Sequence, residues 1–331
     1  MLDIGIVGLG GIGNNHARCY ADNKHTRVVA VCDIDKSRAD NAATRWDAQP
    51  YYSVRQMLKS GINLDACSVT TAGIENGGDH YRPTMELLQA NIPVLGEKPI
   101  SNDVSEARRM VALSKKKRIS YGVNLNHRFT PSAIRAKEWL TEGRLGELNI
   151  VNMTMWINNP NESSPWFHIR ALHPHSLDVM RYFAGEVESV QSFFKKGKGR
   201  KIWSNVQVNL LFKNGVIGHL TGSYDAGGSY GLETLELVGS EGRVIINEAC
   251  EKLSFYPRFS QEVESFDHLG GMGGFAETFS SRIGAWVDDL RKNTPPSKVN
   301  AKAEDALKVQ LIIESIIKSW ETSKIVKVPQ K

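Results

Sequence analysis

The hydrophobic pattern of residues 1–122 alternates between short apolar runs and longer stretches of helical spacing. The apolar runs have the length and composition of buried strands and lie at 4–7, 27–32, 66–70, 93–95 and 119–124. Helical patterns lie at 14–20, 36–46, 53–59, 81–90 and 104–114, and Pro83 falls in a first helical turn, where proline is tolerated. This alternation predicts a doubly wound parallel sheet with helices on both faces.

The pattern changes at about residue 123. Val206, Val208 and Leu210 alternate with polar neighbours, which is typical of antiparallel sheet with one buried face. Further strands are predicted at 148–155, 187–194, 215–224, 232–238 and 243–247, and helices at 131–141, 174–184, 275–291 and 301–320. Asn214-Gly215 and 240–242 are typical of hairpin turns. We therefore expect two domains, a parallel α/β domain over 1–122 and an α+β domain with a large, mostly antiparallel open sheet over 123–331.

Composition narrows the class of protein. The 331 residues are too many for one comfortable core, and 41% hydrophobic with 23% charged residues is ordinary for a globular protein. A net charge of +5 fits an anionic cofactor or substrate and equally an ordinary soluble surface. The basic runs contain no interleaved aromatics, which argues against nucleic-acid binding. Four scattered cysteines without a C-x-x-C pair suit a reducing compartment. No apolar stretch reaches membrane-spanning length, and no signal peptide is found, so we expect the cytoplasm.

The first strand leads into a glycine-rich turn. Gly8, Gly10 and Gly13 stand at G-x-G-x-x-G spacing, which allows a tight reversal, close approach of a pyrophosphate and close packing of the following helix. Phosphates would bind at that helix N-terminus. Asp33 ends the second strand, where it would hold a ribose 2′-hydroxyl and repel a 2′-phosphate, so NAD is favoured over NADP. Lys36 and Arg38 are interpreted as a solvated helix start.

Several motifs together resemble the Gfo/Idh/MocA oxidoreductases. The opening turn with His16-Ala17, the Val31-Cys32-Asp33 strand end and the E-K-P motif at 97–99 match that family. Asn126-His127-Arg128-Phe129 resembles its N-x-R-F segment, and the helix beginning at His175 with Asp178 resembles its H-x-x-D helix. The resemblance covers essentially the whole chain.

The resemblance implies a Rossmann domain for NAD and a second domain whose open sheet forms a homodimer or homotetramer. The implied reaction oxidises a secondary hydroxyl of a sugar, glycoside or inositol, with His175 as proton acceptor, Lys98 as its electrostatic partner and a Lys98–Pro99 peptide that is frequently cis. The implied cofactor-binding residues are Gly8, Gly10, Gly11, Ile12, Gly13, Asp33, Thr70, Thr71, His80, Glu97 and Lys98. The implied substrate-binding residues are Lys98, Asn126, Arg128, Trp156, Asn158, Trp166, His168, Arg170, His173 and His175, of which Arg128 is also expected to hold the domain crossover together.

The chain departs from the family pattern at two places. Ala171 stands where an Asp often precedes the histidine by four residues, so His173 or a residue elsewhere must take its role. The loop 71–80 is longer than the family's short turn, and its extra residues either cover the ribose or form a subunit contact. His168, His173 and His175 could suggest a metal, but no carboxylate lies at a matching spacing, so we expect none.

Two other functions stay open. A redox-neutral, NAD-dependent glycosidase would oxidise its sugar transiently and regenerate NAD, and Ala171 is compatible with it. A non-catalytic cofactor sensor would share the fold, although Lys98 and His175 argue against it.

Overall fold

The computed structural model describes residues 1–73, 78–226, 233–248, 251–271 and 275–330. The chain forms two compact units. Unit 1 consists of residues 1–125 and 279–307, and unit 2 consists of residues 126–278 and 308–331. In the part of the chain described, no helix is long and apolar enough to cross a membrane.

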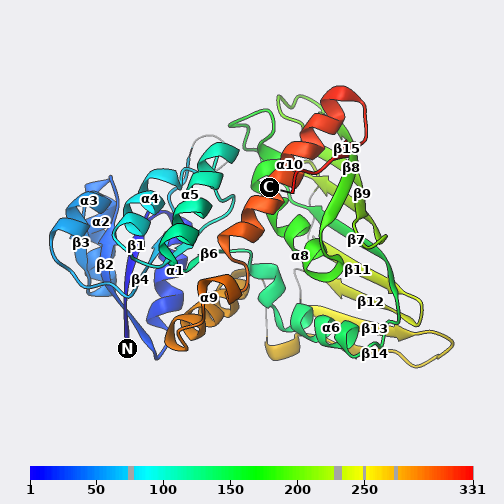
Figure 1. The fold of residues 1–331 in the computed structure, drawn as a ribbon, viewed down its shortest axis with the longest axis horizontal. Coiled ribbons are helices and arrows are strands. Elements are labelled where there is room, and N and C mark those ends of the chain that lie inside the picture. The colour runs from blue at the N-terminus through cyan, green and yellow to red at the C-terminus, as the bar shows by residue number, and fades with distance from the viewer. Residues whose placement is uncertain (74–77, 227–232, 249–250, 272–274, 331) are drawn as a thin grey trace. The chain divides into compact units, whose positions relative to one another are not determined.

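Unit 1 is built on a six-stranded, wholly parallel sheet with the order β3-β2-β1-β4-β5-β6. Its strands are β1 (Leu2–Val7), β2 (Thr26–Cys32), β3 (Gln49–Tyr51), β4 (Ala66–Val69), β5 (Val94–Gly96) and β6 (Tyr121–Val123). The connecting helices are α1 (Gly11–Ala21), α2 (Lys36–Trp46), α3 (Val54–Lys59), α4 (Tyr81–Gln89) and α5 (Val104–Lys117), as Figure 1 shows. The predicted doubly wound sheet is confirmed.

The strand order reverses between β1 and β4, because the chain runs outward through β2 and β3 before it returns. In sheets of this type, ligands bind beyond the carboxyl ends of the strands at such a reversal. The segments that follow these two strands are the glycine turn beginning at Gly8 and the Thr70-Thr71 pair. The topology therefore brings the predicted cofactor residues together.

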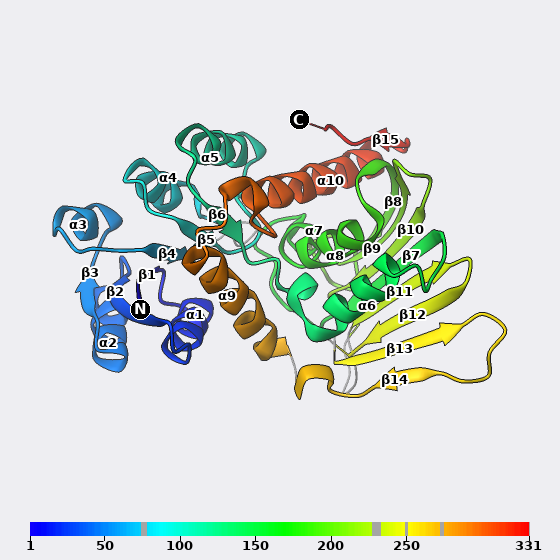
Figure 2. The ribbon, with the colours of Figure 1, turned by 60° about the horizontal axis from the view of Figure 1, so that its bottom comes forward.

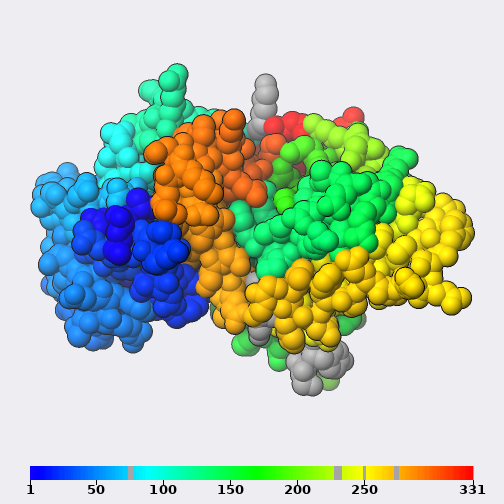
Figure 3. Space-filling model, turned by 90° about the horizontal axis from the view of Figure 1, so that it is seen from below, coloured from blue at the N-terminus to red at the C-terminus, as the bar shows by residue number. Residues whose placement is uncertain are grey.

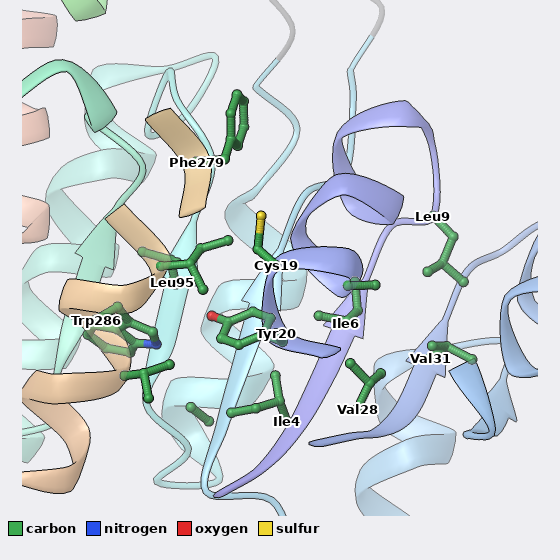
Figure 4. Packing of buried hydrophobic residues seen from close by; sticks show 14 of the residues in the cluster. Ile4, Ile6, Leu9, Cys19, Tyr20, Val28, Val31, Leu95, Phe279 and Trp286 are labelled. Carbon is green, nitrogen blue, oxygen red and sulfur yellow. The ribbon is translucent and has the colours of Figure 1, made fainter. Parts of the chain in front are cut away.

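A segment near the C-terminus completes the core of unit 1. Ile283 and Trp286 of α9 (Phe275–Arg291), together with Val299, are buried in one cluster with Ile4 and Leu95 (Figure 4). Figure 3 shows this segment, in orange, beside the blue N-terminal elements. The division of the chain thus differs from the expected one, because residues 279–307 belong to unit 1 and the first break lies at 125 rather than 122. Residues 303–307 of α10 (Ala303–Thr322) also belong to unit 1, and the rest of that helix belongs to unit 2.

Unit 2 contains a nine-stranded sheet with the order β14-β13-β12-β11-β7-β10-β9-β8-β15. Its neighbours are antiparallel except for the parallel pair β7 and β10, so the predicted sheet type is confirmed. The strands are β7 (Leu148–Trp156), β8 (Val187–Lys195), β9 (Asn205–Phe212), β10 (Ile217–Ser223), β11 (Glu233–Gly239), β12 (Gly242–Asn247), β13 (Lys252–Pro257), β14 (Glu264–Phe266) and β15 (Val326–Lys327).

Helices of unit 2 cover one face of this sheet. They are η1 (Asn126–Phe129), α6 (Pro131–Thr141), α7 (Phe167–Ala171), α8 (Pro174–Ala184) and the unit 2 part of α10, and Figure 2 shows them on the same side of the strands. Two further short helical turns are η2 (Leu269–Gly271) and η3 (Pro296–Lys298), the latter in unit 1. The opposite face carries no helix among the described residues.

Candidate functional site

The glycine turn of unit 1 has three positions with different surroundings. Gly8 has φ +91°, a conformation that side chains rarely adopt. A Cβ on Gly13 would lie 1.8 Å from the Gly8 carbonyl oxygen, so α1 packs against the turn only because this residue is glycine. A Cβ on Gly10 would meet nothing within 4 Å, so the backbone there is open to an approaching group. Thr70 Oγ1 donates to the Gly8 carbonyl oxygen at 2.6 Å and fixes the turn.

Asp33 lies at the edge of a cavity of about 470 Å³ that the turn also lines. Its Oδ2 accepts from the Leu9 N–H at 2.7 Å, and its Oδ1 accepts from the Asp35 N–H at 2.9 Å. Each carboxylate oxygen has a further lone pair, so the side chain could also accept from two ribose hydroxyls. Thr70 and Thr71 line the same cavity, and Ile12 and Gly11 are exposed at the start of α1.

These features fit an adenine dinucleotide. The open backbone at Gly10 and the uncapped N-terminus of α1 suit a pyrophosphate, and Asp33 suits a ribose. The cavity is also lined by three arginines that the sequence analysis did not place there, Arg38, Arg55 and Arg82. Arg38 pairs at 3.5 Å with Asp35, which caps the same helix, α2. Arg82 pairs at 3.1 Å with Glu86, one turn further along α4.

A buried polar network connects α1 with the end of β5. His16 Nε2 lies 3.0 Å from Glu97 Oε1, and His16 Nδ1 lies 3.1 Å from Ser68 Oγ, which also contacts the Tyr20 hydroxyl. Asn124 Nδ2 donates to the same Glu97 oxygen at 2.5 Å. Burial alone would raise the pKa of Glu97, but the hydrogen bonds from His16 and Asn124 and the charges of His16 and Lys98 hold it below its ordinary value.

Lys98 follows Glu97 directly, and its backbone N–H donates to Glu97 Oε2 at 3.1 Å. The Lys98–Pro99 peptide is cis, as the family resemblance led us to expect. Burial lowers the pKa of Lys98, and the negative charge of Glu97 opposes that shift. His80 is buried behind this segment, where its Nδ1 lies 2.8 Å from the Pro99 carbonyl oxygen. Residues 74–77 of the long loop lie outside the described residues, and Thr71 Oγ1 donates to the Asp79 carbonyl oxygen at 2.6 Å.

In unit 2, His175 lies in the first turn of α8 and is 5% exposed. Its imidazole is stacked on that of His127, with ring centroids 4.6 Å apart and planes inclined by 8°. His127 Nδ1 in turn lies 2.8 Å from Glu233 Oε1 at the start of β11. The sequence analysis did not predict this arrangement, because the three residues are far apart in the chain and no local spacing links them.

The other two histidines form a separate buried pair. His168 Nε2 lies 3.0 Å from His173 Nε2, and His173 Nδ1 lies 3.1 Å from Ser176 Oγ. Burial lowers the pKa of His168 to about 3 and that of His173 well below its ordinary value, so both rings are neutral near neutral pH. Throughout the described ranges, no group of three or more His, Cys, Asp or Glu side chains is placed to hold a metal ion.

The remaining predicted substrate residues make several contacts inside unit 2. Arg128 forms a two-pronged ion pair with Asp178, with Nε 2.7 Å from Oδ2, and so ties η1 to α8. Arg170 forms a similar pair with Glu314 at 2.8 Å and 2.9 Å. Asn126 Nδ2 donates to Thr278 Oγ1.

The predicted aromatic residues differ in exposure. Trp156, at the end of β7, is 41% exposed, and Asn158 beyond it is exposed as well. The Trp166 ring stacks on Trp203 with centroids 5.8 Å apart and meets Phe194 edge-on. Trp156 and Asn158 are thus exposed at the surface of unit 2, whereas the Trp166 ring is packed against aromatic neighbours.

Comparisons with known proteins agree with this geometry. The family profile described as an oxidoreductase family with an NAD-binding Rossmann fold matches residues 2–125, and the Gfo/Idh/MocA C-terminal domain matches residues 133–245. The chain is 26% identical over 318 residues to inositol 2-dehydrogenase of Rubrobacter xylanophilus, covering 90% of this chain and 85% of that one. It is 22% identical over 291 residues to levoglucosan dehydrogenase of Pseudarthrobacter phenanthrenivorans, covering 74% and 73% of the two chains.

A solved structure of levoglucosan dehydrogenase in complex with NADH and levoglucosan has the same fold. It superimposes with a TM-score of 0.87 at 21% identity and covers 99% of this chain and 100% of that one. Models of the same family thus match residues of both units of this chain. The N-terminal domain of the chain is an NAD-binding Rossmann fold. The chain belongs to the Gfo/Idh/MocA family of oxidoreductases.

Proposed function

We propose that the protein is an NAD-dependent dehydrogenase that oxidises a secondary hydroxyl of a sugar, glycoside or inositol. The observation that carries the proposal is the buried His175 imidazole at the start of α8, in a chain whose other unit holds an NAD cradle. Relatives named inositol 2-dehydrogenase and levoglucosan dehydrogenase support the substrate class.

The chain's own residues would divide the chemistry as follows. A nicotinamide cofactor bound at the glycine turn and Asp33 would supply the hydride acceptor. His175 accepts the hydroxyl proton, since an imidazole can exchange a proton near neutral pH. The Lys98 ammonium is proposed to stabilise the negative charge that develops on the substrate oxygen. Burial lowers the pKa of Lys98, and the negative charge of Glu97 opposes that shift and so favours the charged ammonium.

Substrate binding is proposed for the exposed end of β7. Trp156 offers a flat apolar face on which a sugar ring could stack, and Asn158 offers an amide for hydroxyl groups. The other predicted residues (Asn126, Arg128, Trp166, His168, Arg170 and His173) would shape the surroundings through the contacts they make inside unit 2.

The experiment that tests this function is NADH formation by the full chain across inositols, free sugars, anhydrosugars, glycosides and sugar phosphates. NAD and NADP are supplied in parallel. We expect NADH with at least one of these classes and a preference for NAD. Tight NAD binding with no NADH from any class would contradict the proposal.

A redox-neutral glycosidase is the second candidate, and Ala171, in place of the carboxylate that the family often has there, keeps it open. Its sugar would be oxidised and then reduced again, so glycoside cleavage would occur without net NADH. Release of the aglycone in the same panel, measured with catalytic NAD, separates the two functions.

We also propose a cytoplasmic homodimer or homotetramer formed through the uncovered face of the nine-stranded sheet. Leu211 and Ile217 are cross-strand partners on β9 and β10, and they are 40% and 53% exposed. Contiguous exposed apolar side chains favour association. Light scattering of the wild type and of Leu211→Glu tests this, and a monomeric wild type would contradict it.

A further inference from the structure

We propose that Glu233, acting through His127, supplies the carboxylate that the family pattern leads one to expect at Ala171. Both are positioning residues for His175, and the inference rests on the proposed role of His175 as proton acceptor. The structural basis is a chain of two contacts within unit 2. Glu233 Oε1 lies 2.8 Å from His127 Nδ1, and the His127 ring is stacked on the His175 ring at 4.6 Å.

The elements that carry these side chains are themselves fixed. Asp178 pairs with Arg128 and ties η1, which carries His127, to α8, which carries His175. Glu233 begins β11, where it is opposite Met155 of β7, and its carbonyl oxygen accepts from the Glu248 N–H at 3.0 Å. His127, Glu233 and His175 are all less than one-tenth exposed. The relative positions of the three side chains are therefore set by contacts between the elements that carry them, as well as by the contacts between the side chains themselves.

The stack holds the plane of the His175 ring. The ring nitrogens lie at the edge of that plane, where they can still exchange a proton. The contact of Glu233 with His127 Nδ1, at 2.8 Å, places a carboxylate at the edge of the ring that is stacked on His175. When His175 accepts a proton, a positive charge forms in a buried place where water screens little. The negative charge of Glu233 stabilises that charge through the intervening ring.

His173 is poorly suited to the same role. Both of its ring nitrogens lie within hydrogen-bond distance of buried partners, His168 and Ser176. Burial keeps the pKa of His173 well below its ordinary value, so its ring is neutral. A neutral ring provides no negative charge to stabilise a protonated His175.

Other charged side chains lie on α8 and on the elements packed against it. Lys137 of α6 donates to the Tyr182 carbonyl oxygen of α8 at 2.8 Å, and three arginines form ion pairs. Arg128 pairs with Asp178, Arg181 of α8 with Glu186, and Arg170 of α7 with Glu314. The neighbouring strand β7 carries no charged residue. Glu233 is a carboxylate in direct contact with the ring that is stacked on His175.

The test follows the protonation of His175 directly, by NMR of the full chain labelled at histidine. The His175 signal is assigned from the spectrum of His175→Gln. We expect Glu233→Gln to lower the pH of half-protonation of His175 by about one unit, because a nearby negative charge is removed. Glu264→Gln, which removes a carboxylate paired with Arg144 elsewhere in unit 2, should leave it unchanged. An unchanged His175 titration in Glu233→Gln would overturn the inference.

A kinetic measurement separates positioning from a purely structural role. With an active substrate, Glu233→Gln should lower kcat on the order of tenfold or more and move the acidic limb of the pH profile to lower pH. The KM for NAD should stay the same. Glu233→Asp, which keeps the charge, should restore part of kcat and most of the His175 titration. If Glu233→Gln does not fold, His127→Gln carries the comparison, and a wild-type His175 titration in His127→Gln would overturn the inference.

The two proposals fail in different ways. If the wild type forms no NADH, the proposed function fails, while the NMR titration still decides whether Glu233 acts on His175. If the wild type is active and His175→Gln is not, but Glu233→Gln matches the wild type in both measurements, only the role of Glu233 is wrong.

Discussion

His16 on α1 and Glu97 after β5 are in direct contact inside unit 1, with His16 Nε2 3.0 Å from Glu97 Oε1. The contact joins the helix that follows the glycine turn to the residue that precedes Lys98. Because Asn124 donates to the same carboxylate oxygen, the network also reaches the end of β6. The cofactor turn and the E-K-P segment therefore share one buried carboxylate.

Replacing Glu97 should destabilise the protein in a pH-dependent way. Glu97→Gln removes hydrogen bonds to a buried charge, and we expect it to cost about 2 kcal/mol of unfolding free energy at neutral pH. Although burial alone would raise it, the folded-state pKa of Glu97 is held below the ordinary value of 4.5 by His16, Lys98 and Asn124. Its stabilisation is therefore present above that pH and is lost as the pH falls through the folded-state value.

Denaturant unfolding of both proteins at neutral pH and at successively lower pH measures this difference. The difference in unfolding free energy between the wild type and Glu97→Gln should become smaller as the Glu97 carboxyl of the wild type becomes protonated. A gap that stays constant down to the acid limit of folding would show that the Glu97 charge contributes nothing.

The glycine turn offers two substitutions with opposite consequences. Gly13→Ala places a Cβ 1.8 Å from the Gly8 carbonyl oxygen, so we expect a loss of at least about 2 kcal/mol of stability. Gly10→Ala places its Cβ in open space and should leave unfolding unchanged. Since the pyrophosphate would occupy that space, Gly10→Ala should weaken NAD binding at least about tenfold. Calorimetric titration with NAD measures the affinity of both variants, and thermal unfolding measures their stability. Wild-type NAD affinity in a folded Gly10→Ala variant would contradict the proposed approach of the pyrophosphate to the backbone at Gly10.

Asp33 should determine which dinucleotide binds. Asp33→Asn keeps an acceptor oxygen for the Leu9 N–H but removes the charge, so we expect NAD affinity to fall about tenfold and NADP affinity to rise. Asp35→Asn is the matched control, because Asp35 caps α2 and asparagine is an equally good cap. Dissociation constants for both cofactors are the measurement. An unchanged ratio of the NAD and NADP dissociation constants in Asp33→Asn would show that Asp33 does not bind the ribose.

Local sequence patterns predicted most of unit 1 because each of its features is local. The apolar run before Gly8, the spacing to Gly13 and the strand ending before Asp33 are all read within a few dozen residues. The short strand β3 was missed because Gln49–Tyr51 contains a proline and too few residues to show a period. In β13, buried Leu253 and Phe255 alternate with Ser254 and Tyr256, which is the period-2 pattern typical of a strand with one buried face.

Long-range packing could not be predicted in this way. The helical pattern of 275–291 indicates a helix but not that Ile283 and Trp286 complete the core of unit 1. The stack of His127 on His175 and the contact of His127 with Glu233 likewise depend on how η1, α8 and β11 meet. Such contacts follow from the folded topology, and the local pattern of a single sequence carries no record of them.

The central claim is that Lys98 and His175 carry out the oxidation of a secondary alcohol. The most direct measurement is the rate of NADH formation by the wild type, His175→Gln, Lys98→Met and the exposed control Lys116→Ala on an active substrate. We predict that His175→Gln and Lys98→Met each lose on the order of 10²–10⁴-fold in rate while still binding NAD, and that Lys116→Ala matches the wild type. Wild-type rates of NADH formation in both His175→Gln and Lys98→Met would contradict the account.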